Sequence, residues 1–145
     1  MTTFKCQPKI AAIGIVCAMT AVVAYGKDSM VGVWSGQVAG KTNRPVSVTL
    51  NIEQDDSLGQ AAGSIEYGLP WQCSLNLQYD GERESNGAKV FSLSIPLIAA
   101  APGPHCQVLI GGFVSVLTTD SGTLSTLVVT RYNDVKDKTT LTRRP

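Results

Sequence analysis

Strict alternation of apolar and polar side chains is the feature that most limits how this chain can fold. Over residues 46–52 the sequence is Val-Ser-Val-Thr-Leu-Asn-Ile. Successive side chains of a strand point to opposite faces, so this stretch predicts a strand with one buried face and one face in water. A helical period of apolar residues is almost absent from the rest of the chain. The sequence therefore favours β structure throughout.

Similar alternation recurs along the chain and predicts about eight short strands. Turn residues separate them, and the pair Asn86-Gly87 is the strongest short hairpin signal. Gly111-Gly112 lies inside one apolar stretch, where it suggests a bulge or a sharp bend. The expected strands cover residues 31–38, 46–52, 63–67, 73–79, 91–95, 108–117, 124–132 and a short 139–143.

Short strands joined by tight turns predict an all-β, single-domain antiparallel meander. We expect a small β-barrel with one disulfide, since closing the sheet removes the exposed strand edges that promote aggregation. A β-sandwich is the alternative, because strand pairing cannot be seen in one sequence.

The first 26 residues predict a cleaved signal peptide. Lys5 and Lys9 precede an uncharged apolar run over residues 10–23, and small residues follow up to Gly26. The run is shorter than the roughly 20 apolar residues that a transmembrane helix needs. We expect one β domain over residues 27–145, a periplasmic or secreted location, and no transmembrane segment after cleavage. The chain has no Asn-x-Ser/Thr sequon, which fits a bacterial protein.

Cleavage would remove Cys6 and Cys17 and leave Cys73 and Cys106. An even pair in an oxidising compartment predicts a disulfide, worth about 3–4 kcal/mol in the chain-entropy model. A lipid on Cys17 is the alternative, although the preceding Val16 is larger than the residue usual there. Two thiols and one histidine are too few for a structural zinc site, so we expect no metal and no cofactor.

Gly32-Val33-Trp34, at the start of the first expected strand, resembles the Gly-x-Trp that opens lipocalins and avidin-type proteins, the calycin barrels. In that family the Trp closes one end of the barrel and a basic residue on a late strand packs across it. The resemblance implies this part for Arg131 and a barrel cavity for a small apolar ligand. In layout the chain is also similar to small exported barrels that inhibit lysozyme in bacteria.

Catalytic and nucleic-acid-binding patterns are missing from the sequence. Lys and Arg number 12 against 11 Asp and Glu, and no basic block offers a face for phosphates, so no nucleic acid is expected as a partner. His105 is the only histidine and would have to serve any Ser-His-Asp triad. Between Pro104 and Cys106 we expect it to be an exposed loop residue. The Asp55-Asp56 pair suggests a solvated turn, and no catalytic residues are expected.

The predicted disulfide points to one place on the domain. Bonded cysteines hold their Cα atoms about 5.5–6 Å apart, so residues preceding Cys73 and Cys106 should meet at one rim. Aromatic and apolar residues there would suit a binding surface. In the competing interpretation the apolar loop folds inward and plugs the barrel end, with Trp71 in the core. The candidate rim comprises Tyr67, Trp71, Leu97, Ile98 and His105.

Three functions remain compatible with the sequence. The first is a non-enzymatic exported protein that binds or inhibits another extracytoplasmic protein, as inhibitors and immunity proteins do. The second is a carrier of a small apolar ligand, and the third is an envelope accessory protein with no discrete site. A filled barrel would favour the first, whereas an interior void above roughly 300 Å³ would favour the second.

Overall fold

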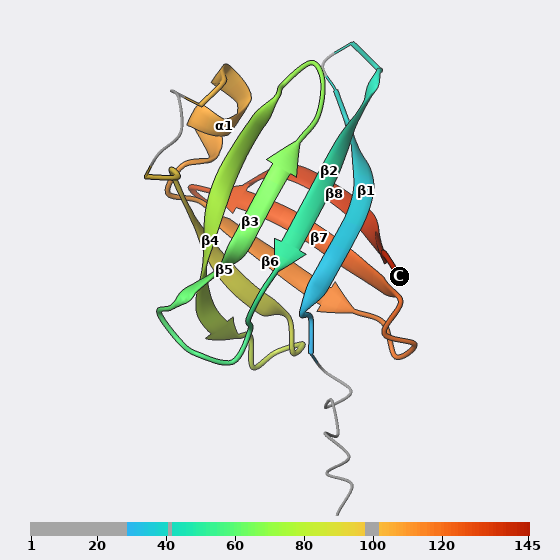
Figure 1. Cartoon of the computed structure of the whole chain (residues 1–145), viewed down its shortest axis with the longest axis vertical. Helices are drawn as coiled ribbons and strands as arrows, with labels where there is room; N and C mark the ends of the chain where they lie inside the picture. The colour runs from blue at the N-terminus through green and yellow to red at the C-terminus, as the bar shows by residue number, and fades with distance from the viewer. Residues whose placement is uncertain (1–28, 41, 98–101) are drawn as a thin grey trace, which may run out of the picture.

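The structure, a computed structural model, describes residues 29–40, 42–97 and 102–145. Within these residues, eight antiparallel strands close into a barrel in which each strand pairs with the next and β8 pairs with β1 (Figure 1). The predicted all-β meander barrel is confirmed, and the sandwich alternative is excluded. The predicted signal peptide lies outside the described residues. The elements are β1 (Gly32–Ala39), β2 (Pro45–Ile52), β3 (Ala61–Tyr67), β4 (Cys73–Glu82), β5 (Lys89–Ser94), α1 (Pro104–Leu109), β6 (Phe113–Thr118), β7 (Leu124–Arg131) and β8 (Asp134–Arg143).

The alternating residues fill the barrel interior. On β2, Val46 and Leu50 are fully buried, while Ser47 between them is exposed. Trp34 and Phe91 are the two largest of the fully buried side chains. Because the side chains of an eight-stranded barrel are just large enough to fill it, this arrangement is a packed core. The alternating apolar residues of β2, β4 and β5 are at most 3% exposed: Val46, Val48, Leu50, Leu75, Leu77, Phe91 and Leu93.

Glycines bend the strands where the barrel curves. The pairing of β3 with β4 shifts register beside Gly63, which has a φ of 135°. A Cβ atom at this position would lie 1.9 Å from the carbonyl oxygen of Asn51, so no other residue fits there. The β4–β5 register shifts in the same way beside Gly81, whose φ is 109°.

Two sequence-based boundaries are wrong. The expected strand over 108–117 begins instead with the end of α1, because Pro104 starts a helix and Gly111, with a φ of 76°, follows its end. The last strand begins at Asp134, five residues earlier than expected, because its outer face carries Lys and Thr and hides the alternation.

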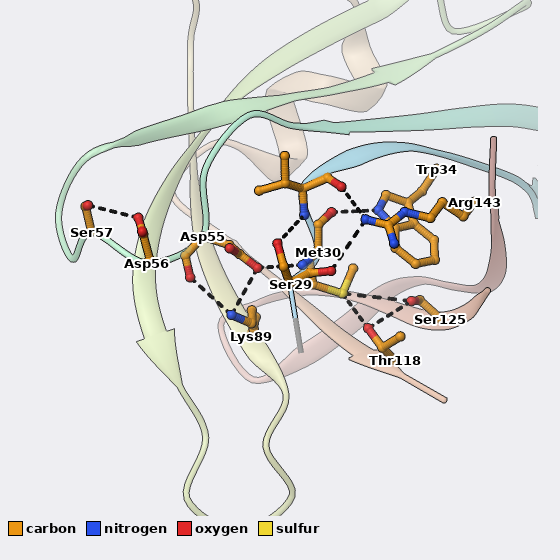
Figure 2. Close-up of polar contacts among 11 residues, drawn as sticks. Ser29, Met30, Trp34, Asp55, Asp56, Ser57, Lys89, Thr118, Ser125 and Arg143 are labelled. Carbon is orange, nitrogen blue, oxygen red and sulfur yellow. Dashed lines mark hydrogen bonds and ion pairs between the residues drawn. The ribbon is translucent and has the colours of Figure 1, made fainter. Parts of the chain in front are cut away.

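Trp34 lies fully buried near the barrel mouth opposite α1, but Arg131 does not pack across it. The guanidinium of Arg143 lies over the Trp34 ring, 5.0 Å from its centre (Figure 2). The register pairs Trp34 with Arg143, whereas Arg131 ends β7 at the other end of the barrel. There Arg131 stacks on Tyr132 instead.

Candidate functional site at the α1 end

A disulfide ties α1 to the barrel. Cys73, the first residue of β4, is bonded to Cys106 on α1, with 6.0 Å between their Cα atoms. The predicted pairing is confirmed. α1 therefore lies beside the upper end of β4 in Figure 1, near the β3–β4 and β7–β8 turns. The helix plugs this end of the barrel with Leu109, which is fully buried.

His105 is not the exposed loop residue that the sequence suggests. It lies on α1, and its side chain is 13% exposed. Its Nε2 atom is 3.0 Å from Oδ2 of Asp137. The imidazole stacks on the ring of Trp71 with 3.5 Å between ring centres, and it meets Tyr67 edge-on at 4.8 Å.

Asp137 joins the two other polar groups of this cluster. It is a buried residue of β8, and its Oδ2 also accepts a hydrogen bond of 2.9 Å from the Tyr67 hydroxyl. Burial first, and then the neighbouring Asp137 carboxylate, raise the pKa of Tyr67 far above its ordinary value. Tyr67 therefore stays protonated and donates at any physiological pH. The sequence analysis missed Asp137 because its strand was expected to begin at residue 139.

These contacts hold α1 against the end of the barrel. The partners of His105 within the described residues are an acid, a phenol and an indole, and the nearby sulfur atoms are locked in the disulfide. In the same residues, no group of three or more His, Cys, Asp or Glu side chains is arranged to hold a metal ion. The cluster binds α1 to β3 and β8.

The expected rim residues divide into two groups. Tyr67 is 3% exposed and His105 is largely covered, so both lie beneath the surface. Trp71 packs partly against the core, and Leu97 is fully exposed. Ile98 lies outside the described residues. The outward part of the predicted rim therefore consists of Leu97 and one side of Trp71.

Further exposed apolar residues, which the sequence analysis missed, lie at the same end of the barrel. Tyr132 is 84% exposed in the two-residue β7–β8 turn, with a φ of 52° that is costly for an aromatic residue. The Arg131 guanidinium donates a hydrogen bond of 3.0 Å to the Tyr132 hydroxyl and also stacks on the Tyr132 ring. The same guanidinium donates a hydrogen bond of 2.9 Å to the carbonyl of Val108 on α1. The α1-end surface is defined here as Leu69, Trp71, Leu97, Val108, Tyr132 and Val135.

Comparison of the chain with protein-family models, with curated proteins and with solved structures found no significant match. Among the helices within the described ranges, none has the length and apolar character to cross a membrane.

Proposed function

We propose that this protein is a non-enzymatic, exported binding protein that docks onto another extracytoplasmic protein through the α1-end surface. The observation that carries the proposal is the gathering of exposed apolar side chains at one end of the barrel. Leu69, Leu97 and Tyr132 are 71%, 101% and 84% exposed. Large apolar side chains left in water at one place commonly mark an interaction site.

Internal contacts hold the α1-end surface in place, which favours the binding of a protein partner. The disulfide, the Asp137 hydrogen bonds and the Trp71–His105 stack hold its backbone segments together. A surface fixed in advance loses less conformational entropy when a partner binds. Tyr132 and Trp71 are of the residue types that dominate binding energy at protein interfaces.

The barrel interior argues against carriage of an apolar ligand. Its side chains are buried and close-packed around Trp34 and Phe91. A hollow of about 420 Å³ does lie at the opposite mouth, but most of its lining residues are polar. Its volume is above the roughly 300 Å³ expected of a ligand site. Its lining, however, does not form an apolar chamber.

The experiment compares three forms of the protein, each isolated gently from its own host's envelope fraction and measured by native mass spectrometry. The first is the wild type, the second is a Leu97→Ser/Tyr132→Ser variant, and the third is a Leu58→Ser/Leu124→Ser control. Leu58 and Leu124 are exposed apolar residues at the other end of the barrel. We expect a stoichiometric protein complex for the wild type and the control, and its loss in the α1-end variant.

Three outcomes contradict the proposal. A wild-type chain without any partner favours the envelope accessory role, and a bound small molecule in place of a protein favours the carrier role. A complex that survives in the α1-end variant moves the binding surface elsewhere on the barrel. Circular dichroism of each variant checks that the fold is retained.

A further inference from the structure

The mouth of the barrel opposite α1 contains a hollow of about 420 Å³ that is separate from the α1-end surface. It lies between the β4–β5 hairpin and the β6–β7 turn. This volume is within the range of small-molecule sites, about 300–1,000 Å³. The lining residues are Met30, Glu82, Asn86, Gly87, Lys89, Val116, Leu117, Thr118, Thr119 and Asp120.

The floor of the hollow is held in a defined position by Met30, which is 1% exposed. Its backbone N–H donates a hydrogen bond of 2.6 Å to Oδ2 of Asp55, and its carbonyl accepts one of 2.8 Å from the Trp34 indole. Its sulfur accepts hydrogen bonds from the hydroxyls of Thr118 and Ser125 (Figure 2). Every polar group of this residue therefore has a partner, and the floor exists before any ligand arrives.

The positive charge in the wall is already neutralised. The Lys89 ammonium lies 3.0 Å from Oδ2 of Asp55 and also donates 3.2 Å to the Asp55 carbonyl, as Figure 2 shows. Both side chains are largely buried, at 14% and 6% exposure. Asp55 is thus not the solvated turn residue that the sequence suggests. An anionic ligand would have to compete with this carboxylate for Lys89.

Two carboxylates in the lining have no cationic partner among the residues that the structure describes. Glu82 comes from the β4–β5 hairpin and Asp120 from the β6–β7 turn, and neither forms an ion pair with a residue that the structure describes. The hollow as a whole is therefore negatively charged. Of its apolar lining residues, Met30 and Val116 are each 1% exposed and Leu117 is 40% exposed, so Leu117 offers most of the contact for a short hydrocarbon chain.

We infer that this hollow binds a small aliphatic amine, with a linear diamine as the simplest member of the class. The two carboxylates, on separate hairpins, accept hydrogen bonds from the ligand's ammonium groups. Its methylene groups lie against the exposed side chain of Leu117. Charge-assisted hydrogen bonds from ammonium groups to carboxylates are the stronger kind, which suits a site open to water on one side.

The test uses the full chain and 1,4-diaminobutane as the probe, with 1,4-butanediol as the uncharged compound of equal length. Binding is followed by calorimetry and by backbone amide NMR signals. We expect saturable shifts at Gly87, Thr118 and Thr119 with the diamine, none with the diol, and none at Val108 on α1. In a Glu82→Gln/Asp120→Asn variant the affinity should fall about tenfold or more, which corresponds to about 1.4 kcal/mol.

The matched control is a Glu84→Gln/Asp56→Asn variant, which removes two exposed carboxylates that do not line the hollow. Its affinity should stay at the wild-type value. Equal loss in both variants would show general attraction of cations to an acidic end of the barrel and would overturn the site. Absence of saturable shifts, or equal shifts with the diol, would overturn it as well.

Discussion

The indole of Trp71 lies flat on the imidazole of His105, with 3.5 Å between the ring centres and 13° between the ring planes. Trp71 belongs to the β3–β4 turn, and His105 belongs to α1. The stack therefore acts beside the disulfide, which joins α1 to Cys73 just after this turn, and it involves the same imidazole that contacts Asp137. The same contact holds Trp71, one member of the α1-end surface, against α1.

Replacing Trp71 should show how much this stack contributes. We expect Trp71→Ala to lower the free energy of unfolding by about 2–3 kcal/mol, somewhat less than the loss typical of a fully buried aromatic residue. Trp71→Phe keeps an aromatic face against His105 and should recover about half of the loss. Urea unfolding of the three proteins measures both effects. Equal losses for the two variants would mean that only burial matters.

Removing the Asp137 carboxylate should leave two buried partners without their acceptor. We expect Asp137→Ala to destabilise the fold by about 2–3 kcal/mol, since the Tyr67 hydroxyl then has no hydrogen-bond partner. The control is Asp134→Ala on the same strand, whose carboxylate pairs with Lys136 near the surface. That change should cost less than about 0.5 kcal/mol, as is common for exposed pairs. Similar losses in both variants would contradict a special role for Asp137.

The raised pKa of Tyr67 predicts a loss of stability at alkaline pH. The unfolded chain releases the tyrosine proton near pH 10, whereas the folded protein holds it to higher pH because burial and Asp137 disfavour the phenolate. The stabilisation is complete below about pH 10 and declines as the pH rises above that value. The experiment compares urea midpoints of the wild type and Tyr67→Phe at neutral and alkaline pH.

Tyr67→Phe should be less stable than the wild type at neutral pH, and the difference should shrink as the pH rises. Tyr132→Phe is the control, since its hydroxyl lies at the surface, and its stability should follow the wild type at every pH. A constant difference between Tyr67→Phe and the wild type would contradict the predicted ionisation.

Loss of the disulfide should lower the stability of the whole fold and loosen α1 most. In the chain-entropy model, a Cys73→Ala/Cys106→Ala variant should be about 3–4 kcal/mol less stable, because the unfolded chain is no longer constrained. Hydrogen exchange should show faster opening of α1 amides than of β2 amides, since β2 is bonded on both sides and buried. Uniformly faster exchange in both elements would contradict a local anchoring role.

Arg143 and Arg144 allow a matched comparison at the opposite mouth. Arg143 stacks on Trp34 and donates to the carbonyls of Ser29 and Val31, whereas Arg144 contacts the hydroxyl of Ser35. We expect Arg143→Ala to cost about 1 kcal/mol, in the range of an exposed cation–π contact, and Arg144→Ala to cost clearly less. Thermal unfolding of both variants measures the difference, and a reversed order would contradict it.

Much of the fold could be predicted from the sequence. The alternation in β2 and its repeats is a local property, because each strand must turn every second side chain toward the core. The disulfide was predicted from the two cysteines that remain once the expected signal peptide is removed. The prediction was wrong where local composition and structure differ, as in α1, where a Pro starts a helix within an apolar stretch, and in β8, where polar side chains hide a strand.

The candidate site could be predicted only in part. Cys73 and Cys106 placed Trp71 and His105 at one end of the barrel, because a disulfide brings its neighbours with it. Asp137 and Tyr132 could not be found in this way, since they lie on β8 and in the turn before it, far along the chain from either cysteine. Likewise, only the register between β1 and β8 shows that Arg143, and not Arg131, lies over Trp34.

The sequence by itself determined that this chain forms strands, which residues face inward and which cysteines pair, because these properties depend on side-chain period and composition. The tertiary structure alone decided that His105 meets Asp137, that Lys89 is neutralised by Asp55, and which apolar side chains remain in water. Those relationships depend on the closing of the barrel and on strand register. Both arise from contacts between residues far apart in the chain, whose pairing no local pattern specifies.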